Sequence, residues 1–328
     1  LIRGRELTEL VAAGTSFEGV VEILWDTGPG PLTASPARLA EVSRLQDLLP
    51  AHTGLLERLR ITVAMAGADP LRHDLSTPGV VGAGRSLLGL MVVGLPGRAV
   101  DPVRSCCAAS RLGARLGTAT ASPERVRALD AALALLVDHG LAVSTFGARL
   151  AASVRADPYS VVSAGRGVIG GTLHGAASAQ VHELLERASN ADPVAAVGEF
   201  HRRGGLIPGF GHVIYRHRDP RRDLLEGFLR EGWPSDPRLD VLDEVIEAVR
   251  SRSEVVANVD LTLGALTWLA GWPAEAGEAV FAIARTAGWL AHALEEYDEE
   301  PLRFRPRARY VGPRTGSVAS DGGTGGQA

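Results

Sequence analysis

Apolar residues recur at spacings of three and four along most of the chain, and this period constrains the fold more than any other feature. The stretch 122–140 is the clearest case, because Ser122 suits a helix cap and Pro123 suits the first helical position. Runs of β-branched and aromatic residues, which favour strands, are short and few. The sequence therefore predicts a mainly α-helical fold, with further helices over 35–49, 55–67, 237–251 and 277–297.

The 328 residues are enough for one large domain or two smaller ones around a sizeable core. Two Gly- and Pro-rich stretches, 76–85 and 204–211, are predicted to be connections between helices. The last residues, rich in Gly and Ser, are typical of a disordered tail. Because the chain starts at Leu1 without Met, we expect an N-terminal segment of the protein to be missing from this sequence.

Composition and motifs exclude several classes of function. A net charge of −4 argues against nucleic-acid binding, although all 34 basic residues are arginine. The two cysteines, Cys106 and Cys107, are adjacent and predict no disulfide, which fits a reducing cytoplasm. No apolar stretch reaches the roughly 18–20 residues that cross a bilayer. No metal-binding, phosphate-binding or nucleophile motif is present, and no metal is expected.

Four places carry residues suited to chemistry. His174 and His212 each stand beside glycines, which let a backbone approach a ligand closely. Asp260 interrupts an apolar stretch, where a carboxylate is costly unless it is paired or used in a reaction. Arg285 lies among apolar residues, where a guanidinium needs a carboxylate or phosphate, either of the protein or of a ligand. Each residue taken alone also fits a purely structural role, as does the arginine-rich stretch 216–222.

These residues lie in motifs whose order and wording resemble the citrate synthase family. "GGTLHGAAS" around His174 and "GFGHVIYRHRDPR" around His212 resemble its two histidine motifs, and "NVD" at 258–260 resembles its catalytic-aspartate motif. "FAIARTAGWLAHALEE" and the following "RPRARYVGP" resemble its C-terminal helix and closing segment. The N-terminal "LIRGRELTELVAAGTSFEGVVEILW" is similar to an early segment of the family, so the resemblance spans residues 1–313.

The resemblance implies a two-domain helical fold with the active site in the cleft between a large and a small domain. The large domain would comprise 1–175 and 275–313, the small domain 176–274, and the disordered tail 314–328. The implied reaction joins the methyl carbon of an acyl-CoA thioester to the keto carbon of oxaloacetate and then hydrolyses the thioester. CoA is thus a co-substrate, and no permanently bound cofactor is expected.

Residue roles follow from the same resemblance. Asp260 would be the base, His174 the donor to the thioester oxygen and His212 the donor to the oxaloacetate keto oxygen. The substrate-binding residues would be His139, Arg221, Arg285 and Arg305, with Arg305 supplied by the second subunit of a homodimer. CoA would contact Arg216, Gly209, Gly211 and Asn258. A small dianionic substrate is in any case suited to arginines, which bind carboxylates with two hydrogen bonds.

The chain also departs from the family pattern. Where many members read HxDHExNxS, this chain has "LVDHGLAVS", so that Leu136, Gly140 and Ala142 replace a His, a Glu and an Asn. Leu261 and Thr262 replace a Phe-Tyr pair beside the base. Two hypotheses therefore remain. The first is an active synthase that uses acetyl-CoA or propionyl-CoA, and the second is a divergent paralogue that binds a metabolite as a sensor or an interaction subunit.

Overall fold

The computed structural model describes residues 1–97, 107–117, 122–171, 177–202 and 206–312. Cys106, His174 and the tail 314–328 lie outside these ranges. In the described ranges the chain forms helices and two isolated β-bridges, and no strand longer than such a bridge. The prediction of a mainly α fold is therefore confirmed. The helices are α1 Leu7–Ala12, α2 Phe17–Trp25, α3 Pro36–Asp47, α4 Leu55–Ala66, α5 Thr77–Val93, α6 Ala108–Leu116, α7 Pro123–Leu136, α8 Val143–Ser153, α9 Pro158–Ile169, α10 Ala177–Asn190, α11 Pro193–Arg202, α12 Pro220–Gly232, α13 Arg238–Arg250, α14 Val259–Ala270 and α15 Ala276–Asp298.

Helix starts follow the cap residues of the sequence. The hydroxyl of Ser122 accepts a hydrogen bond from the backbone N–H of Arg125 at 3.3 Å and begins α7, as predicted. Ser35 begins α3 in the same way, by accepting from the backbone N–H of Arg38. These bonds satisfy N–H groups that the first turn of a helix otherwise leaves without partners.

The prediction of a connection over 76–85 is wrong, because this stretch is the first half of α5. Ser76 and Pro78 form a helix start there, and one of the glycines that suggested a loop, Gly84, serves packing. A Cβ on Gly84 would lie 2.7 Å from the ring of Trp25 and 2.8 Å from Leu290. The missing side chain thus lets α5 approach α2 and α15 closely, and this gain in packing outweighs the low helix propensity of glycine.

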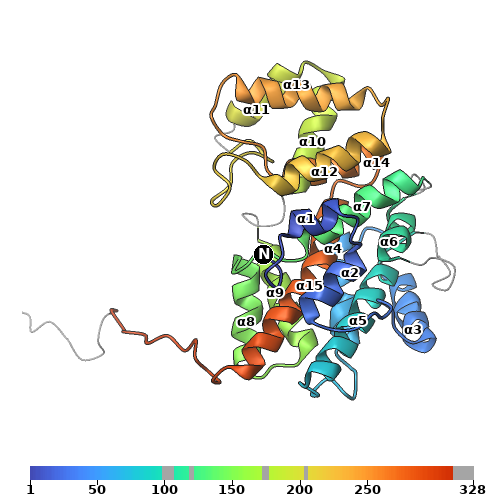
Figure 1. Ribbon diagram of the computed structural model, residues 1–328, viewed down its shortest axis with the longest axis vertical. Coiled ribbons are helices and arrows are strands. Elements are labelled where there is room, and N and C mark those ends of the chain that lie inside the picture. Colours follow the sequence, from blue (N-terminus) through green and yellow to red (C-terminus); the bar gives the residue numbers. More distant parts are fainter. Residues whose placement is uncertain (98–106, 118–121, 172–176, 203–205, 313–328) are drawn as a thin grey trace, which may run out of the picture.

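The helices form two groups, and α7 lies where they meet (Figure 1). At one end α10 packs against α11, α13 and α14. At the other end α15 packs against α5, α7, α8 and α9, and most of its residues are buried. Helix α12 packs against both α14 and α7, so it lies at the junction of the two groups. None of the helices in the described ranges is both long and apolar enough to span a bilayer.

Candidate active site

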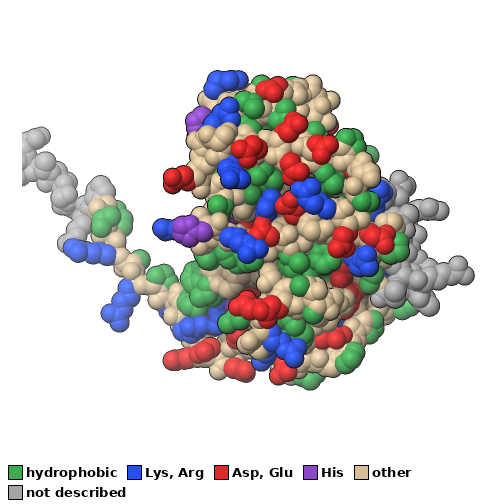
Figure 2. All heavy atoms as spheres, turned by 45° about the horizontal axis from the view of Figure 1, so that its top comes forward, with side chains coloured by type: hydrophobic (Ala, Val, Ile, Leu, Met, Phe, Trp, Pro, Cys, Tyr) green, Lys and Arg blue, Asp and Glu red, His purple; other side chains and the backbone are tan. Residues whose placement is uncertain are grey.

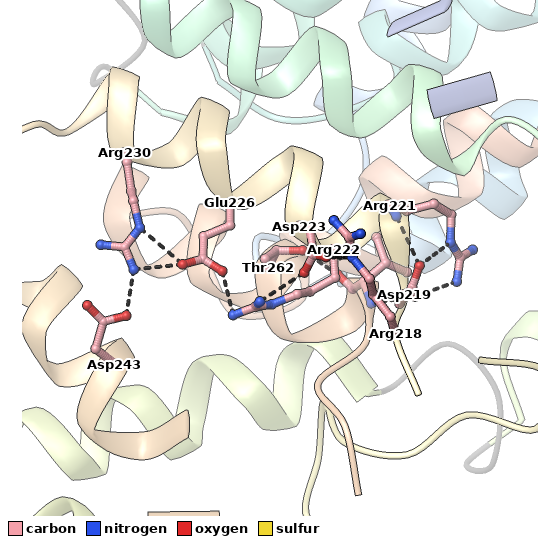
Figure 3. Close-up of polar contacts among 10 residues, drawn as sticks. Arg218, Asp219, Arg221, Arg222, Asp223, Glu226, Arg230, Asp243 and Thr262 are labelled. Carbon is pink, nitrogen blue, oxygen red and sulfur yellow. Dashed lines mark hydrogen bonds and ion pairs between the residues drawn. The ribbon is translucent and has the colours of Figure 1, made fainter. Parts of the chain in front are cut away.

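The start of α12 is built around a buried ion pair between Asp219 and Arg221. Arg221 donates from Nε to one carboxylate oxygen of Asp219 at 3.0 Å and from a terminal nitrogen to the other at 2.8 Å (Figure 3). Asp219 also accepts backbone N–H groups from Arg221 and, at 3.0 Å, from Val259 at the start of α14. One carboxylate therefore holds the starts of two helices together, and it is fully satisfied by four donors.

The loop before α12 is fastened to the start of α14. The backbone of Asn258 donates to the carbonyl of Gly209 at 2.9 Å, and its side-chain amide donates to the carbonyl of Gly211 at 2.7 Å. Gly209 and Gly211 have φ angles of +80° and +79°, which favour glycine. The Asn258 side chain also accepts from the N–H of Asp260 and caps α14. These three residues, predicted to contact CoA, thus hold His212 and Asp260 on one framework.

His212 presents one ring nitrogen as a donor. Its Nδ1 lies 3.0 Å from the backbone nitrogen of Ile214 and 3.2 Å from that of Tyr215, and both of these groups are donors. Nδ1 must therefore accept, and in the neutral ring the proton is on Nε2. Burial, followed by the charge of Arg221, lowers the pKa of His212 and favours this neutral form.

His139 approaches His212 from the other group of helices, just after the end of α7. The two rings lie edge to face with centroids 5.4 Å apart, and Nε2 of His139 is 3.3 Å from the hydroxyl of Tyr215. Burial and the charges of Arg221 and Arg285 lower the pKa of His139 to about 4. Its imidazole is therefore neutral near pH 7.

Arg285 lies in the middle of α15 and is 2% exposed. Its Nε donates to the carbonyl of Leu136 at 2.8 Å, and its guanidinium covers the ring of Phe281. Among the described residues it forms no ion pair within 4.0 Å. Burial lowers its pKa to about 10, although the nearby charges of Asp138 and Asp260 act against this fall. The terminal N–H groups of Arg285 remain available to an anion.

Asp260 occupies the first turn of α14 and is only partly exposed. Its carboxylate accepts no hydrogen bond from the described residues. Burial raises its pKa; the nearby charges of Arg221 and Arg285 act against this rise, and that of Asp219 adds to it. A raised pKa makes a carboxylate a stronger base, which suits proton abstraction from a weak acid.

The structure therefore brings together five of the predicted site residues: His139, His212, Arg221, Asp260 and Arg285. Arg216 is exposed on the loop before α12. Arg305 is also exposed. It follows the turn at 301–304, and from there to 312 the segment leads away from the helices and carries several arginines (Figures 1 and 2). His174 lies outside the described residues, so its role stays a prediction.

Three residues of this site had no role in the sequence prediction: Tyr215, Asp219 and Asp138, whose carboxylate accepts the backbone N–H of Gly140 beside His139. Asp219 was recognisable only as part of the Asp-Pro-Arg motif, and nothing in the spacing indicated that its carboxylate reaches a second helix. Tyr215 stands under the guanidinium of Arg221, 4.8 Å from ring centre to Cζ. These contacts depend on how α12, α14 and α7 meet.

A separate cavity of about 300 Å³ lies between α3, α5 and α6. Its lining is mainly apolar, with Arg111 and Arg115 at its edge, and it includes none of the predicted site residues. The chemistry described above is therefore not located in this cavity.

The fold and site define an all-α protein that gathers arginines, neutral histidines and aspartates where two groups of helices meet. The family model for the citrate synthase C-terminal domain matches residues 1–307, and the chain belongs to the citrate synthase family. A citrate synthase homologue of Mycobacterium tuberculosis is 30% identical over 333 residues, covering 95% of this chain and 86% of its own length.

Other relatives match over a shorter range. The citrate synthase of Haloferax volcanii is 35% identical over 190 residues, which are 56% of this chain and 50% of that protein. The chain thus spans about half the length of several curated relatives that it matches. Among solved structures, the citrate synthase of Pyrobaculum aerophilum has a TM-score of 0.75 at 26% identity, covering 95% of this chain and 86% of its own. That of Thermotoga maritima has a TM-score of 0.74 at 25% identity, covering 95% and 89%.

Proposed function

We propose that this protein condenses an acyl-CoA thioester with oxaloacetate and hydrolyses the product, as a citrate synthase does. The observation that carries the proposal is the meeting of Arg221 and Arg285, both at least 95% buried, with two neutral histidines and Asp260. Arg285 forms no ion pair within 4.0 Å with a described residue, and a buried cation of this kind favours an anionic ligand. A solved complex of the Thermoplasma acidophilum citrate synthase with carboxymethyl coenzyme A and oxaloacetate has the same fold.

In the proposed reaction Asp260 takes a proton from the methyl carbon of the thioester. The resulting enolate carbon attacks the keto carbon of oxaloacetate, and the keto oxygen takes a proton from Nε2 of His212. The proton that Asp260 removed balances this transfer, and its return to the ring of His212 restores both groups. Arg221 and Arg285 bind the two carboxylates of oxaloacetate. His174 would donate to the thioester oxygen, where negative charge develops. Hydrolysis of the thioester then releases CoA with its free thiol.

We further propose that α10–α14 act as a small domain that closes on the remaining helices when oxaloacetate binds. Arg221 lies on α12 in the proposed small domain, and Arg285 lies on α15 among the remaining helices, so one dianion can attract both. Closure would exclude water before the thioester reacts.

The same proposal includes a homodimer. Helix α8 and its flanks expose large apolar side chains, namely Leu141, Val143, Phe146, Leu150 and Val154. Burial of this surface against a second copy would remove apolar area from water. The segment 299–312 extends from the end of α15, which runs beside α8, so Arg305 is free to reach a neighbouring site.

The experiment is a thiol-release assay with oxaloacetate and either acetyl-CoA or propionyl-CoA, on the wild type and on Asp260→Asn. The wild type should release CoA with at least one thioester, and the variant should be at least about a hundredfold slower. Oxaloacetate binding should survive in the variant, because Asp260 does not hold a carboxylate. If the wild type binds oxaloacetate but releases no CoA, the divergent paralogue is the correct description.

A further inference from the structure

A chain of polar contacts runs from the segment after α15 to the loop that carries His139. Arg303 donates to both carboxylate oxygens of Glu296, at 2.7 and 2.6 Å. The side chain of Glu296 is fully buried, and Arg149 on α8 reaches it at 2.9 Å. Glu296 therefore joins the segment 299–312 to α8 and α15.

The series of polar contacts continues from Arg149 to His292, which lies one turn before Glu296 on α15. A terminal nitrogen of Arg149 lies 3.0 Å from Nδ1 of His292, and Nε2 of His292 lies 3.1 Å from a carboxylate oxygen of Asp138. Since arginine has only donors, Nδ1 must accept, and the ring proton is on Nε2. The ring of His292 thus accepts from Arg149 and donates to Asp138.

Asp138 transmits this contact to the site. Its second carboxylate oxygen accepts the backbone N–H of Gly140 at 3.1 Å, so Asp138 fixes the chain on both sides of His139. The only hydrogen bond of the His139 ring to a described side chain is the one to Tyr215, at 3.3 Å. The placement of this ring therefore depends on the backbone of 138–140.

We propose that His292 is a positioning residue, which holds the His139 loop in place through Asp138 and connects it, through Arg149 and Glu296, to the segment 299–312. The inference deepens the proposed function, because the loop matters to catalysis only if His139 binds oxaloacetate. Through His292, the segment that carries Arg305 is linked to the active site of the same subunit.

The test compares His292→Ala with His292→Gln and with the matched control His182→Ala. His182 is also a buried histidine, hydrogen-bonded to the hydroxyl of Thr267 at 2.9 Å, but it has no contact with this chain of residues. Two quantities are measured: the exchange rate of the Gly140 amide proton, followed by NMR, and the kinetic constants of thiol release.

His292→Ala should speed exchange of the Gly140 amide at least about tenfold and raise KM for oxaloacetate by about as much, with kcat within twofold. His292→Gln keeps a donor toward Asp138 and should restore most of both values. Arg303→Gln should change both in the same direction by about two- to threefold, because it is three contacts further away. His182→Ala should change neither.

The inference is overturned if His292→Ala leaves Gly140 exchange at the wild-type rate, or if His182→Ala speeds it equally. It is also overturned if exchange speeds up while KM for oxaloacetate stays unchanged in an active enzyme. Amide exchange needs no substrate. Faster exchange in a protein that does not bind oxaloacetate would therefore retain the structural link and reject the proposed function.

Discussion

The two arginines of the site are held in different ways. On one side, Arg221 is 5% exposed and locked against Asp219, which also joins the starts of α12 and α14. On the other side, Arg285 is 2% exposed and has a single backbone carbonyl as its hydrogen-bond acceptor among the described residues. The difference teaches that Arg221 belongs to the architecture as well as to the site. Arg285, by contrast, forms no ion pair within 4.0 Å among the described residues, which is why we propose that it receives a ligand.

The largest expected loss of stability follows from breaking the ion pair between Asp219 and Arg221. Asp219→Ala leaves Arg221 buried without a partner and the N–H of Val259 without an acceptor. It should lower the free energy of unfolding by at least about 3 kcal/mol, measured by urea denaturation. The matched control is Asp243→Ala, which breaks the half-exposed pair with Arg230 and should cost less than about 1 kcal/mol. Equal losses in the two variants would contradict the distinction.

A second prediction uses pH. The pKa of His139 falls from 6.5 in the unfolded chain to about 4 in the folded protein, first through burial and then through Arg221 and Arg285. Between these values the unfolded chain binds the proton and the folded protein does not. The free energy of unfolding is therefore unaffected by His139 above about pH 6.5, and it decreases as the pH falls from there towards about 4.

The His139→Gln variant should lose about 1 to 2 kcal/mol less unfolding free energy than the wild type over this pH range, after allowance for the partial exposure of the ring. Thermal unfolding of both proteins from pH 7.5 to pH 4 measures it, with exposed His201→Gln as the control. If the wild type and His139→Gln lose stability in parallel, His139 is not held as described.

A third prediction concerns the loop on the Arg221 side. A Cβ on Gly211 has open space around it, so Gly211→Ala meets only the strain of its φ of +79°. The free energy of unfolding should fall by about 1 kcal/mol. Gly209→Ala adds a clash at 2.8 Å with Val181 and should cost more. Chemical denaturation of both variants gives the order, and a reversed order would show that the loop is not fastened as described.

The smallest effect on stability is expected at Arg285. Arg285→Met removes a buried cation but also leaves the carbonyl of Leu136 without its donor, and these changes oppose each other. The free energy of unfolding should stay within about 1 kcal/mol of the wild type. Arg221→Met should lose at least about 3 kcal/mol, because the buried carboxylate of Asp219 then loses its cation and keeps only two backbone donors. A large loss in Arg285→Met would mean that Arg285, too, has an architectural role.

The sequence indicates much of the fold, for stated physical reasons. Caps such as Ser122 and the three-four period of apolar residues are local signals, and they locate α7, α3 and α15. The glycines of 76–85 led to the wrong prediction of a loop. Gly84 allows a close contact with Trp25 and Leu290, which is visible only once the helices are packed.

The candidate site divides in the same way. Motif resemblance picked out His139, His212, Arg221, Asp260 and Arg285, which the structure brings together. It could not reveal that Asp219 reaches Val259, that Asp138 reaches His292, or which nitrogen of His212 carries the proton. Each of these depends on contacts between residues that are at least two residues and up to 154 residues apart.

The most direct test of the account is calorimetric titration of oxaloacetate into the wild type and into Arg285→Met, without any thioester. The account predicts that the wild type binds and that the variant, equally stable, binds at least about a hundredfold more weakly. Loss of two charge-assisted hydrogen bonds has this effect, equivalent to about 2.7 kcal/mol. Equal affinity in the two proteins would contradict the claim that Arg285 is held without a partner in order to receive a carboxylate.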